Sequence, residues 1–145
     1  PRQDPGSQYA AAVPIFIRRA LEHRDITIFG DGQQTRDFIY VKDVVRANVF
    51  FATESDAGGV YNIACGHART INELAGTVVT LTGSTSGIVH AVDRAGDVKH
   101  SRASTEKARQ AGFSPSHDFD EALSDTIKSL AAPALAGPSQ GTGSR

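Results

Sequence analysis

The order of apolar and polar segments along the chain predicts an α/β fold. Short runs suited to strands alternate with longer segments whose apolar residues recur at helical spacing. Glycine-containing turns end several of the runs, and Ser, Thr or Asp residues stand where helices would begin. The chain has 145 residues, about the length of one ordinary domain. We therefore expect one domain with few short strands that alternate with helices.

The expected elements follow one another closely. Helices are predicted over residues 13–22, 43–53, 70–83, 104–112 and 118–130. Strands are predicted over residues 26–29, 38–41, 60–64 and 88–92.

The first helix and the first strand are indicated by spacing and by turn residues. Pro14 is suited to the first helical position, and apolar residues follow it at helical intervals. The run 26–29 is rich in β-branched residues and ends at the glycine turn 30–32. This predicts a helix packed near a short strand.

The middle of the chain contains stronger helix signals. The apolar run 38–41 leads into Asp43, the predicted N-cap of the second helix. The run 60–64 is mostly apolar, so we expect a buried third strand. Thr70 is followed three residues later by Glu73, which is the spacing of a capping box for the third helix.

The last third of the chain is expected to end in a tail. Ser104 is predicted to begin a short helix, and Asp118 with Glu121 repeats the capping-box spacing. From residue 132 onward the sequence is mostly Ala, Pro, Gly, Ser and Thr, a composition too poor in apolar groups to order itself. We expect a domain over residues 1–131 and a disordered tail over residues 132–145.

Composition excludes several classes of partner. Fifteen basic and sixteen acidic residues give a net charge of −1, so we expect no nucleic-acid partner. The single cysteine, Cys65, excludes an internal disulfide, and we expect it to pack in the core. The histidines lack ligand-like spacing, so no metal site is expected. No apolar run is long enough to span a membrane and no signal peptide opens the chain, so a cytoplasmic protein is expected.

A polar, glycine-containing loop brings an Arg-Asp pair to the start of an apolar run at residues 30–41. Arg36 could form a two-pronged contact with a phosphate or a carboxylate, a geometry that Lys cannot copy. The alternative is a surface ion pair of Arg36 with Asp37 or Asp31.

A second charged stretch, residues 93–101, follows the predicted fourth strand. Arg94 could bind phosphate, and Asp97 could accept hydrogen bonds from the two hydroxyls of a ribose. His100 could act as a general base. The alternative is a solvated charged loop. The sequence contains neither a G-x-G-x-x-G nor a P-loop phosphate motif, so we expect this chain alone to bind no NAD.

Taken in order, these stretches resemble the carboxyl-terminal part of NAD-dependent nucleotide-sugar epimerases and dehydratases, the extended short-chain dehydrogenases. The matching segments are residues 1–5, Tyr9, 13–17, 30–32, 36–44, 61–63, 70–74 and 94–101. The resemblance extends from Pro1 to Leu130 and is strongest to UDP-glucose and UDP-N-acetylglucosamine 4-epimerases. It implies a UDP-sugar-binding portion from which most of the Rossmann half is missing.

The resemblance implies a pocket for the nucleotide base. Thr27 and Phe29 match residues that line the uracil pocket in the family. Ala11 and Ala12 lie where main-chain groups contact the base.

The resemblance also implies contacts to the rest of the substrate. Arg36 and Arg94 match residues that bind the diphosphate, and Asp97 matches the carboxylate that holds the ribose. Ser101 matches a position beside the hexose, where a small side chain leaves room for an N-acetyl group. The sequence departs from the family at Ser104, where relatives have Asp; we interpret both as helix N-caps.

The resemblance places the catalytic machinery upstream of this chain. The glycine-rich NAD loop and the catalytic Ser and Tyr-x-x-x-Lys of the family precede the motif that matches Pro1. The chain has no Met and opens in loop-like sequence, so we expect a fragment that contains no catalytic residue, is inactive alone and exposes apolar surface toward the missing half. For full-length relatives the resemblance implies a homodimer. The alternatives are a fragment of a dehydratase or decarboxylase of the same family, or a non-catalytic binding remnant.

Overall fold

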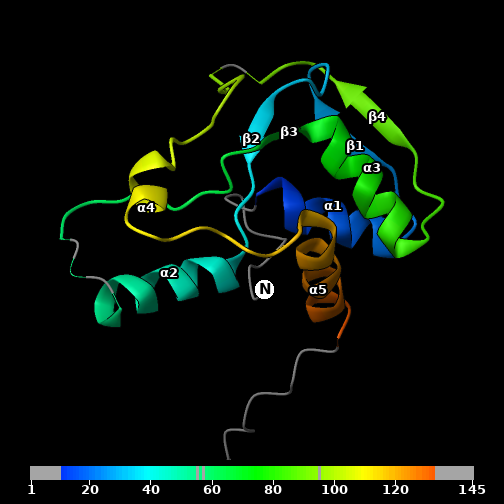
Figure 1. Ribbon diagram of the computed structural model, residues 1–145. Helices are drawn as coiled ribbons and strands as arrows, with labels where there is room; N and C mark the ends of the chain where they lie inside the picture. The colour runs from blue at the N-terminus through cyan, green and yellow to red at the C-terminus, as the bar shows by residue number, and fades with distance from the viewer. Residues whose placement is uncertain (1–10, 55, 57, 95, 133–145) are drawn as a thin grey trace, which may run out of the picture.

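The structure, a computed structural model, describes residues 11–54, 56, 58–94 and 96–132. Its helices are α1 (Ala12–Leu21), α2 (Val41–Thr53), α3 (Ile71–Thr82), α4 (Glu106–Gln110) and α5 (Phe119–Ala131). Its strands are β1 (Ile26–Phe29), β2 (Thr35–Asp37), β3 (Ala68–Thr70) and β4 (Ile88–Ala91). Short strands therefore lie between helices, which confirms the predicted α/β class (Figure 1).

Two groups of predictions fall outside the described residues. Residues 1–10 carry the first part of the family resemblance, and residues 133–145 make up nearly all of the expected tail. Within the described ranges, every helix falls short of the length and apolarity that a membrane crossing requires.

The described strands form two separate pairs. β1 runs parallel to β4, with Phe29 opposite Ala91, and β2 runs antiparallel to β3, with Thr35 opposite Thr70. A further parallel bridge joins Thr35 to His100. The loops after β1 and β4 therefore begin at the same edge, because parallel strands place their carboxyl ends together.

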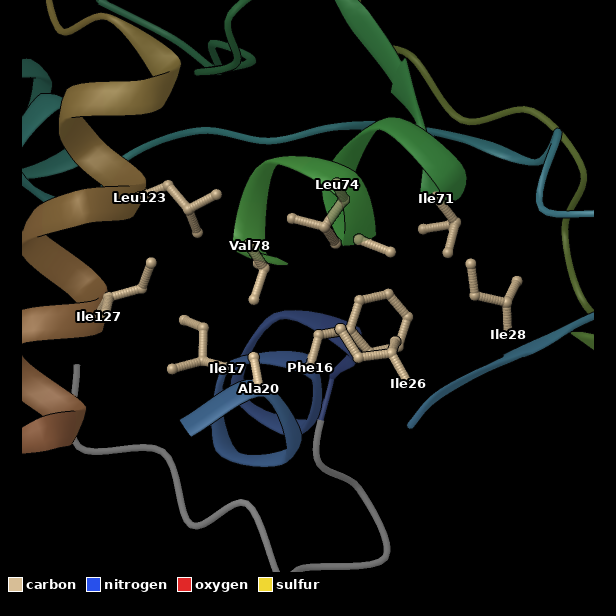
Figure 2. Packing of buried hydrophobic residues seen from close by; sticks show 11 residues of the cluster. Phe16, Ile17, Ala20, Ile26, Ile28, Ile71, Leu74, Val78, Leu123 and Ile127 are labelled. Atoms are coloured by element: carbon tan, nitrogen blue, oxygen red, sulfur yellow. The ribbon is translucent and has the colours of Figure 1, made fainter. Parts of the chain in front are cut away.

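The apolar core lies between α1, α3, α5 and one face of β1 (Figure 2). Its members are Phe16, Ile17, Ala20, Ile26, Ile28, Ile71, Leu74, Ala75, Val78, Leu123 and Ile127. Ile26 and Ile28 point into this core because alternate residues of a strand face the same side. The intervening Thr27 and Phe29 consequently face the other side of β1, where the candidate site lies.

Two helices, α3 and α5, begin at the caps that the sequence predicts. The Thr70 side chain accepts from the Glu73 amide, and the Glu73 carboxylate accepts from the Thr70 amide at 2.7 Å. The backbone amide and the hydroxyl of Thr70 lower the pKa of Glu73 below its ordinary value. Asp118 caps α5 by accepting from the amides of Asp120 and Glu121.

Three predicted helix starts were misplaced. Pro14 is the third residue of α1, because the helix already begins at Ala12. The N-cap of α4 is Thr105, so Ser104 precedes the cap. Asp43 lies in the first turn of α2, and the N-cap of that helix is Tyr40.

Asp43 is fully buried and fastens α2 to the segment that precedes α5. Its carboxylate accepts from Arg46 at 2.8 Å and from the amides of Ser116 at 3.1 Å and His117 at 3.3 Å. The His117 ring nitrogen Nδ1 also lies 3.0 Å from Oδ1, a close electrostatic contact without hydrogen-bond alignment. Burial raises the pKa of Asp43, but its contacts with His117, Ser116 and Arg46 outweigh this and hold the pKa below its ordinary value.

Two strand predictions were wrong. The strand predicted at 38–41 lies three residues earlier, at Thr35–Asp37, because pairing with the distant β3 determines its position. The segment 60–64 is irregular, and Val60 is 85% exposed. Among the described residues it has no strand to pair with, so its apolar composition does not produce a strand.

Candidate functional site

A cavity of about 720 Å³ lies between the start of α1, the outer side of β1, β2 and the loop after β4. Seven of the eight predicted substrate-binding residues line it: Ala11, Ala12, Thr27, Phe29, Arg36, Arg94 and Asp97. The eighth, Ser101, does not line this cavity. The structure therefore brings together residues from four separate parts of the sequence.

The apolar wall of the cavity is built by β1 and by the start of α1. Thr27 and Phe29 line the cavity from β1, and the core residues Phe16, Ile28 and Ile71 line it too, so the cavity reaches the edge of the apolar core. Ala11, the N-cap of α1, and the following residues of the helix complete this wall with apolar side chains that range from Ala12 to Phe16. Such a wall suits a flat, weakly polar group.

Arg36 and Asp97 form an ion pair at the polar side of the cavity. The Arg36 Nη2 donates to Asp97 Oδ1 at 2.7 Å, and its Nη1 donates to the Thr35 carbonyl at 2.9 Å. The two charged stretches chosen from the sequence therefore contact each other. The expected alternative pairs of Arg36 were wrong, because Asp37 and Asp31 accept hydrogen bonds from backbone amides.

Residues 99–101 lie beside β2 and fix the position of the second charged stretch. The Thr35 amide donates to the Lys99 carbonyl at 2.8 Å, and the Ser101 amide donates to the Thr35 carbonyl at 3.1 Å. The Thr35 hydroxyl and His100 Nδ1 are 3.1 Å apart. The Ser101 side chain is exposed at this edge, four residues after Asp97.

Arg94 lies over the ring of Phe29. Its guanidinium carbon is 3.9 Å from the ring centroid, within the range of a cation–π contact. The β1–β4 register brings these two residues close together, because Phe29 pairs with Ala91 and Arg94 comes three residues after Ala91.

Asp37, which also lines the cavity, has a structural role. Its two carboxylate oxygens accept from the amides of Cys65 and Gly66, each at 2.8 Å. The Cys65 thiol donates to the Phe38 carbonyl at 3.0 Å, and burial raises its pKa, as does the nearby Asp37. Cys65 is only half-buried and lies outside the core cluster, so the prediction that it packs in the core was wrong.

Sequence reasoning missed two polar residues near the site. Gln34 lines the cavity and donates from Nε2 to the Phe29 carbonyl at 2.8 Å. Thr35 joins β2 to residues 99–101 through its backbone and side chain. Both lie within the stretch 30–41 that the sequence singles out. The partners of Thr35 are distant in the sequence, and the contact of Gln34 with the Phe29 carbonyl follows no recognised motif.

A larger open cavity, of about 1010 Å³, lies between residues 65–67, 102–109 and 114–117. It contains none of the predicted site residues. We place the candidate site in the smaller cavity because that one combines an apolar wall with two arginines and a carboxylate. Among the described residues, no three His, Cys, Asp or Glu side chains are grouped so that they could hold a metal ion.

Comparisons with known proteins identify the relatives of this chain. Residues 1–64 match the NAD dependent epimerase/dehydratase family. The chain is 33% identical over 129 residues to UDP-glucose 4-epimerase of Mycolicibacterium smegmatis, covering 88% of this chain and 41% of that protein. It is 33% identical over 129 residues to dTDP-glucose 4,6-dehydratase of Streptomyces griseus, covering 88% and 38%.

A third relative has a different activity. UDP-N-acetyl-alpha-D-glucosaminuronate decarboxylase of Bacillus cytotoxicus is 43% identical over 82 residues, covering 57% of this chain and 26% of that protein. The chain spans about two fifths or less of the length of these curated relatives.

Solved structures share the fold. UDP-glucose 4-epimerase of Thermotoga maritima with UDP-glucose has a TM-score of 0.81 and 39% identity, over 88% of this chain and 41% of that one. UDP-N-acetylglucosamine 4-epimerase of Methanobrevibacter ruminantium with UDP-N-acetylmuramic acid has a TM-score of 0.82 and 43% identity, over the same shares. Thermus thermophilus UDP-glucose 4-epimerase with NAD has a TM-score of 0.78 and 32% identity, over 90% and 42%. Family match, relatives and fold agree: this chain belongs to the NAD-dependent epimerase/dehydratase family.

Proposed function

We propose that this chain is the nucleotide-sugar-binding portion of an NAD-dependent UDP-sugar 4-epimerase, an isomerase. The observation that carries the proposal is the position of Arg36, Arg94 and Asp97 in one cavity, opposite the apolar wall of β1 and α1. Two guanidinium groups match the charge of a diphosphate, and the carboxylate matches the hydroxyls of a ribose.

Each part of the substrate has a proposed partner. The base lies against Thr27 and Phe29, near the main chain of Ala11 and Ala12. Arg36 and Arg94 bind the diphosphate. When the ligand binds, contacts from Arg36 to the diphosphate replace part of its ion pair with Asp97. Asp97 then accepts from the ribose hydroxyls. These residues bind and orient the substrate, and the catalytic residues of the family are proposed to lie outside this chain.

NAD does not fit the described residues. The parallel strands β1 and β4 both run into loops, whereas a dinucleotide pyrophosphate rests on a helix that follows such a strand. The helix that directly follows a strand is α3. Its first three amides already donate, to the carbonyls of Gln34 and Gly32 and to the Thr70 hydroxyl, and its first turn carries the negative Glu73. We therefore propose that NAD is held by the remaining half of the complete protein.

Helix α2 offers a surface for that remaining half. Val41, Val45 and Val49, spaced four residues apart, are 48%, 55% and 50% exposed. An apolar stripe of this kind is typical of a helix that packs against further protein. Because the chain spans about two fifths of its epimerase relatives, we propose that the missing Rossmann half covers this stripe.

Dehydratase activity is the second candidate, since the relatives include dTDP-glucose 4,6-dehydratases. The two candidates differ in the nucleotide. UDP has a ribose with two adjacent hydroxyls, whereas dTDP has a deoxyribose with one. A carboxylate that accepts from both hydroxyls loses one charge-assisted hydrogen bond with dTDP, which costs about 1.5–3 kcal/mol.

The experiment is calorimetric titration of the protein with UDP and with dTDP. We expect UDP to bind roughly ten- to a hundredfold more tightly, and Asp97→Ala to reduce that preference. Tighter binding of dTDP would favour the dehydratase. Failure of the folded protein to bind either nucleotide would contradict the proposed site itself.

A further inference from the structure

The two arginines of the cavity are held in place by different kinds of contact. Arg36 is held by hydrogen bonds, and both of its Nη atoms already donate, to Asp97 and to the Thr35 carbonyl. Arg94 is held by the flat face of the Phe29 ring, 3.9 Å from its guanidinium carbon. Among the described residues, no carboxylate lies within ion-pair distance of Arg94.

A ring contact leaves the donors of an arginine available. The guanidinium group is planar, and its five N–H bonds point outward in that plane. Stacking on an aromatic ring uses the face of the group, so the N–H edge can still form a two-pronged contact with a phosphate. Arg94 is therefore arranged to receive an anion without first breaking a protein ion pair.

The stack also limits the freedom of a long side chain. A free arginine has about 2 kcal/mol of rotamer entropy that binding must remove. Phe29 is anchored in β1 by its pairing with Ala91, and the Gly30 amide donates to the Ala91 carbonyl at 2.8 Å. Strand pairing thus holds the backbone of Phe29 in position, and Arg94 lies over its ring.

We propose that Phe29 is a positioning residue for the diphosphate, acting through Arg94, in addition to lining the base pocket. The inference rests on the proposed function, because the anion that Arg94 receives is the diphosphate of the nucleotide sugar. In this proposal, the face of the Phe29 ring contacts the Arg94 guanidinium group. The contribution of the ring to affinity should therefore depend on the phosphates of the ligand and little on the base.

The test compares ligands that share a base and differ in phosphate. Phe29→Leu keeps an apolar side chain and removes the flat ring, whereas Phe29→Tyr keeps the ring. Calorimetry with UDP and uridine should give an affinity for UDP that is about three- to tenfold weaker in Phe29→Leu and unchanged in Phe29→Tyr. The affinity for uridine should change little in either variant. In the Arg94→Ala variant, adding Phe29→Leu should cause little further loss of UDP affinity, because the ring no longer has a guanidinium group to position.

A ligand-free measurement separates this inference from the proposed function. In the protein alone, NMR should show the Arg94 side-chain protons shifted upfield by the Phe29 ring, and this shift should disappear in Phe29→Leu. Equal losses for UDP and uridine would mean that the ring acts only through the base and not through Arg94, which overturns the inference and leaves the nucleotide site standing. An absent ring shift would overturn it too. Failure of the wild-type protein to bind UDP would overturn the proposed function, and the diphosphate role of Phe29 with it.

Discussion

Arg36 donates to Asp97 across 2.7 Å and so joins two segments that are 61 positions apart in the sequence. Both side chains are partly exposed, at 28% and 44%, so the pair adds under about 1 kcal/mol to stability. Its importance is geometric. It keeps the loop after β4 against β2 and places one positive and one negative group where the ligand would meet both.

The first prediction concerns the two arginines. Arg36→Ala and Arg94→Ala should each weaken UDP binding by roughly ten- to a hundredfold, because each removes a charge-assisted contact worth about 1.5–3 kcal/mol. Calorimetric titration measures the affinities. Arg18→Ala is the matched control, since Arg18 lies on the exposed side of α1 and pairs with Glu22. Unchanged UDP affinity in folded Arg36 and Arg94 variants would remove both residues from the site.

The second prediction concerns acid stability. The pKa of Asp43 lies below its ordinary value, so its charged form stabilises the folded state above the unfolded pKa of about 3.9. That contribution is lost as the pH falls below about 4 and through the lower folded pKa. Asp43→Asn should therefore lower the free energy of unfolding by about 2–4 kcal/mol at pH 7. The difference in free energy of unfolding between wild type and this variant should become smaller in acid.

Urea titrations at pH 7 and at several values below pH 4 measure this gap. Asp125→Asn is the control, because Asp125 also has a pKa lowered by a hydrogen bond, from Lys42, but lies at the surface. It should change stability much less. A gap between Asp43→Asn and wild type that stays constant with pH would contradict the role assigned to the buried carboxylate.

The third prediction concerns the exposed stripe of α2. Val45→Lys together with Val49→Glu places opposite charges four residues apart on the helix surface and removes two apolar side chains from solvent. The variant should self-associate less than the wild-type chain in sedimentation experiments, while UDP affinity stays the same. Ala47→Lys, which buries a charge on the opposite side of α2, is the contrasting variant and should unfold the helix region. Equal self-association of wild type and double variant would mean that the stripe does not drive contacts.

Local signals explain why some elements were predicted and others were not. The Thr70–Glu73 capping box depends on neighbouring residues, and β1 contains an apolar, β-branched run of its own, so both were correctly predicted although β1 pairs with the distant β4. β2 consists of the polar residues Thr35–Asp37, and it is a strand because it pairs with Ala68–Thr70. That partner is more than thirty residues away, so the pattern around β2 gives no sign of it.

The candidate site follows the same rule. Arg36, Arg94 and Asp97 could be chosen because charged groups that follow apolar runs are visible in the sequence. The contacts that place them could not, since the Thr35–His100 contact and the Arg94–Phe29 stack join distant segments. The family resemblance supplied the base-pocket residues, which no motif in the chain distinguishes from ordinary core residues.

The fourth prediction concerns the choice of sugar. Ser101 is exposed beside β2, where its amide donates to the Thr35 carbonyl, and its side chain lies outside the lining of the nucleotide cavity. A substrate whose ribose contacts Asp97 would extend its sugar past this cavity, and Ser101 lies only four residues further along. We therefore expect the small Ser101 side chain to leave space there for an N-acetyl group.

Ser101→Tyr should fill that space with a rigid ring. In the full-length enzyme, kcat/KM for UDP-N-acetylglucosamine should fall by at least about tenfold relative to UDP-glucose, because a steric clash with the larger C2 substituent raises its transition state selectively. Ser101→Thr is the matched control: it adds one methyl group, keeps the hydroxyl and should leave the ratio of the two kcat/KM values nearly unchanged. Because the backbone of residue 101 is held by Thr35 in each variant, an altered ratio would report on the side chain itself. An equal fall for both sugars would show that residue 101 does not select the substrate.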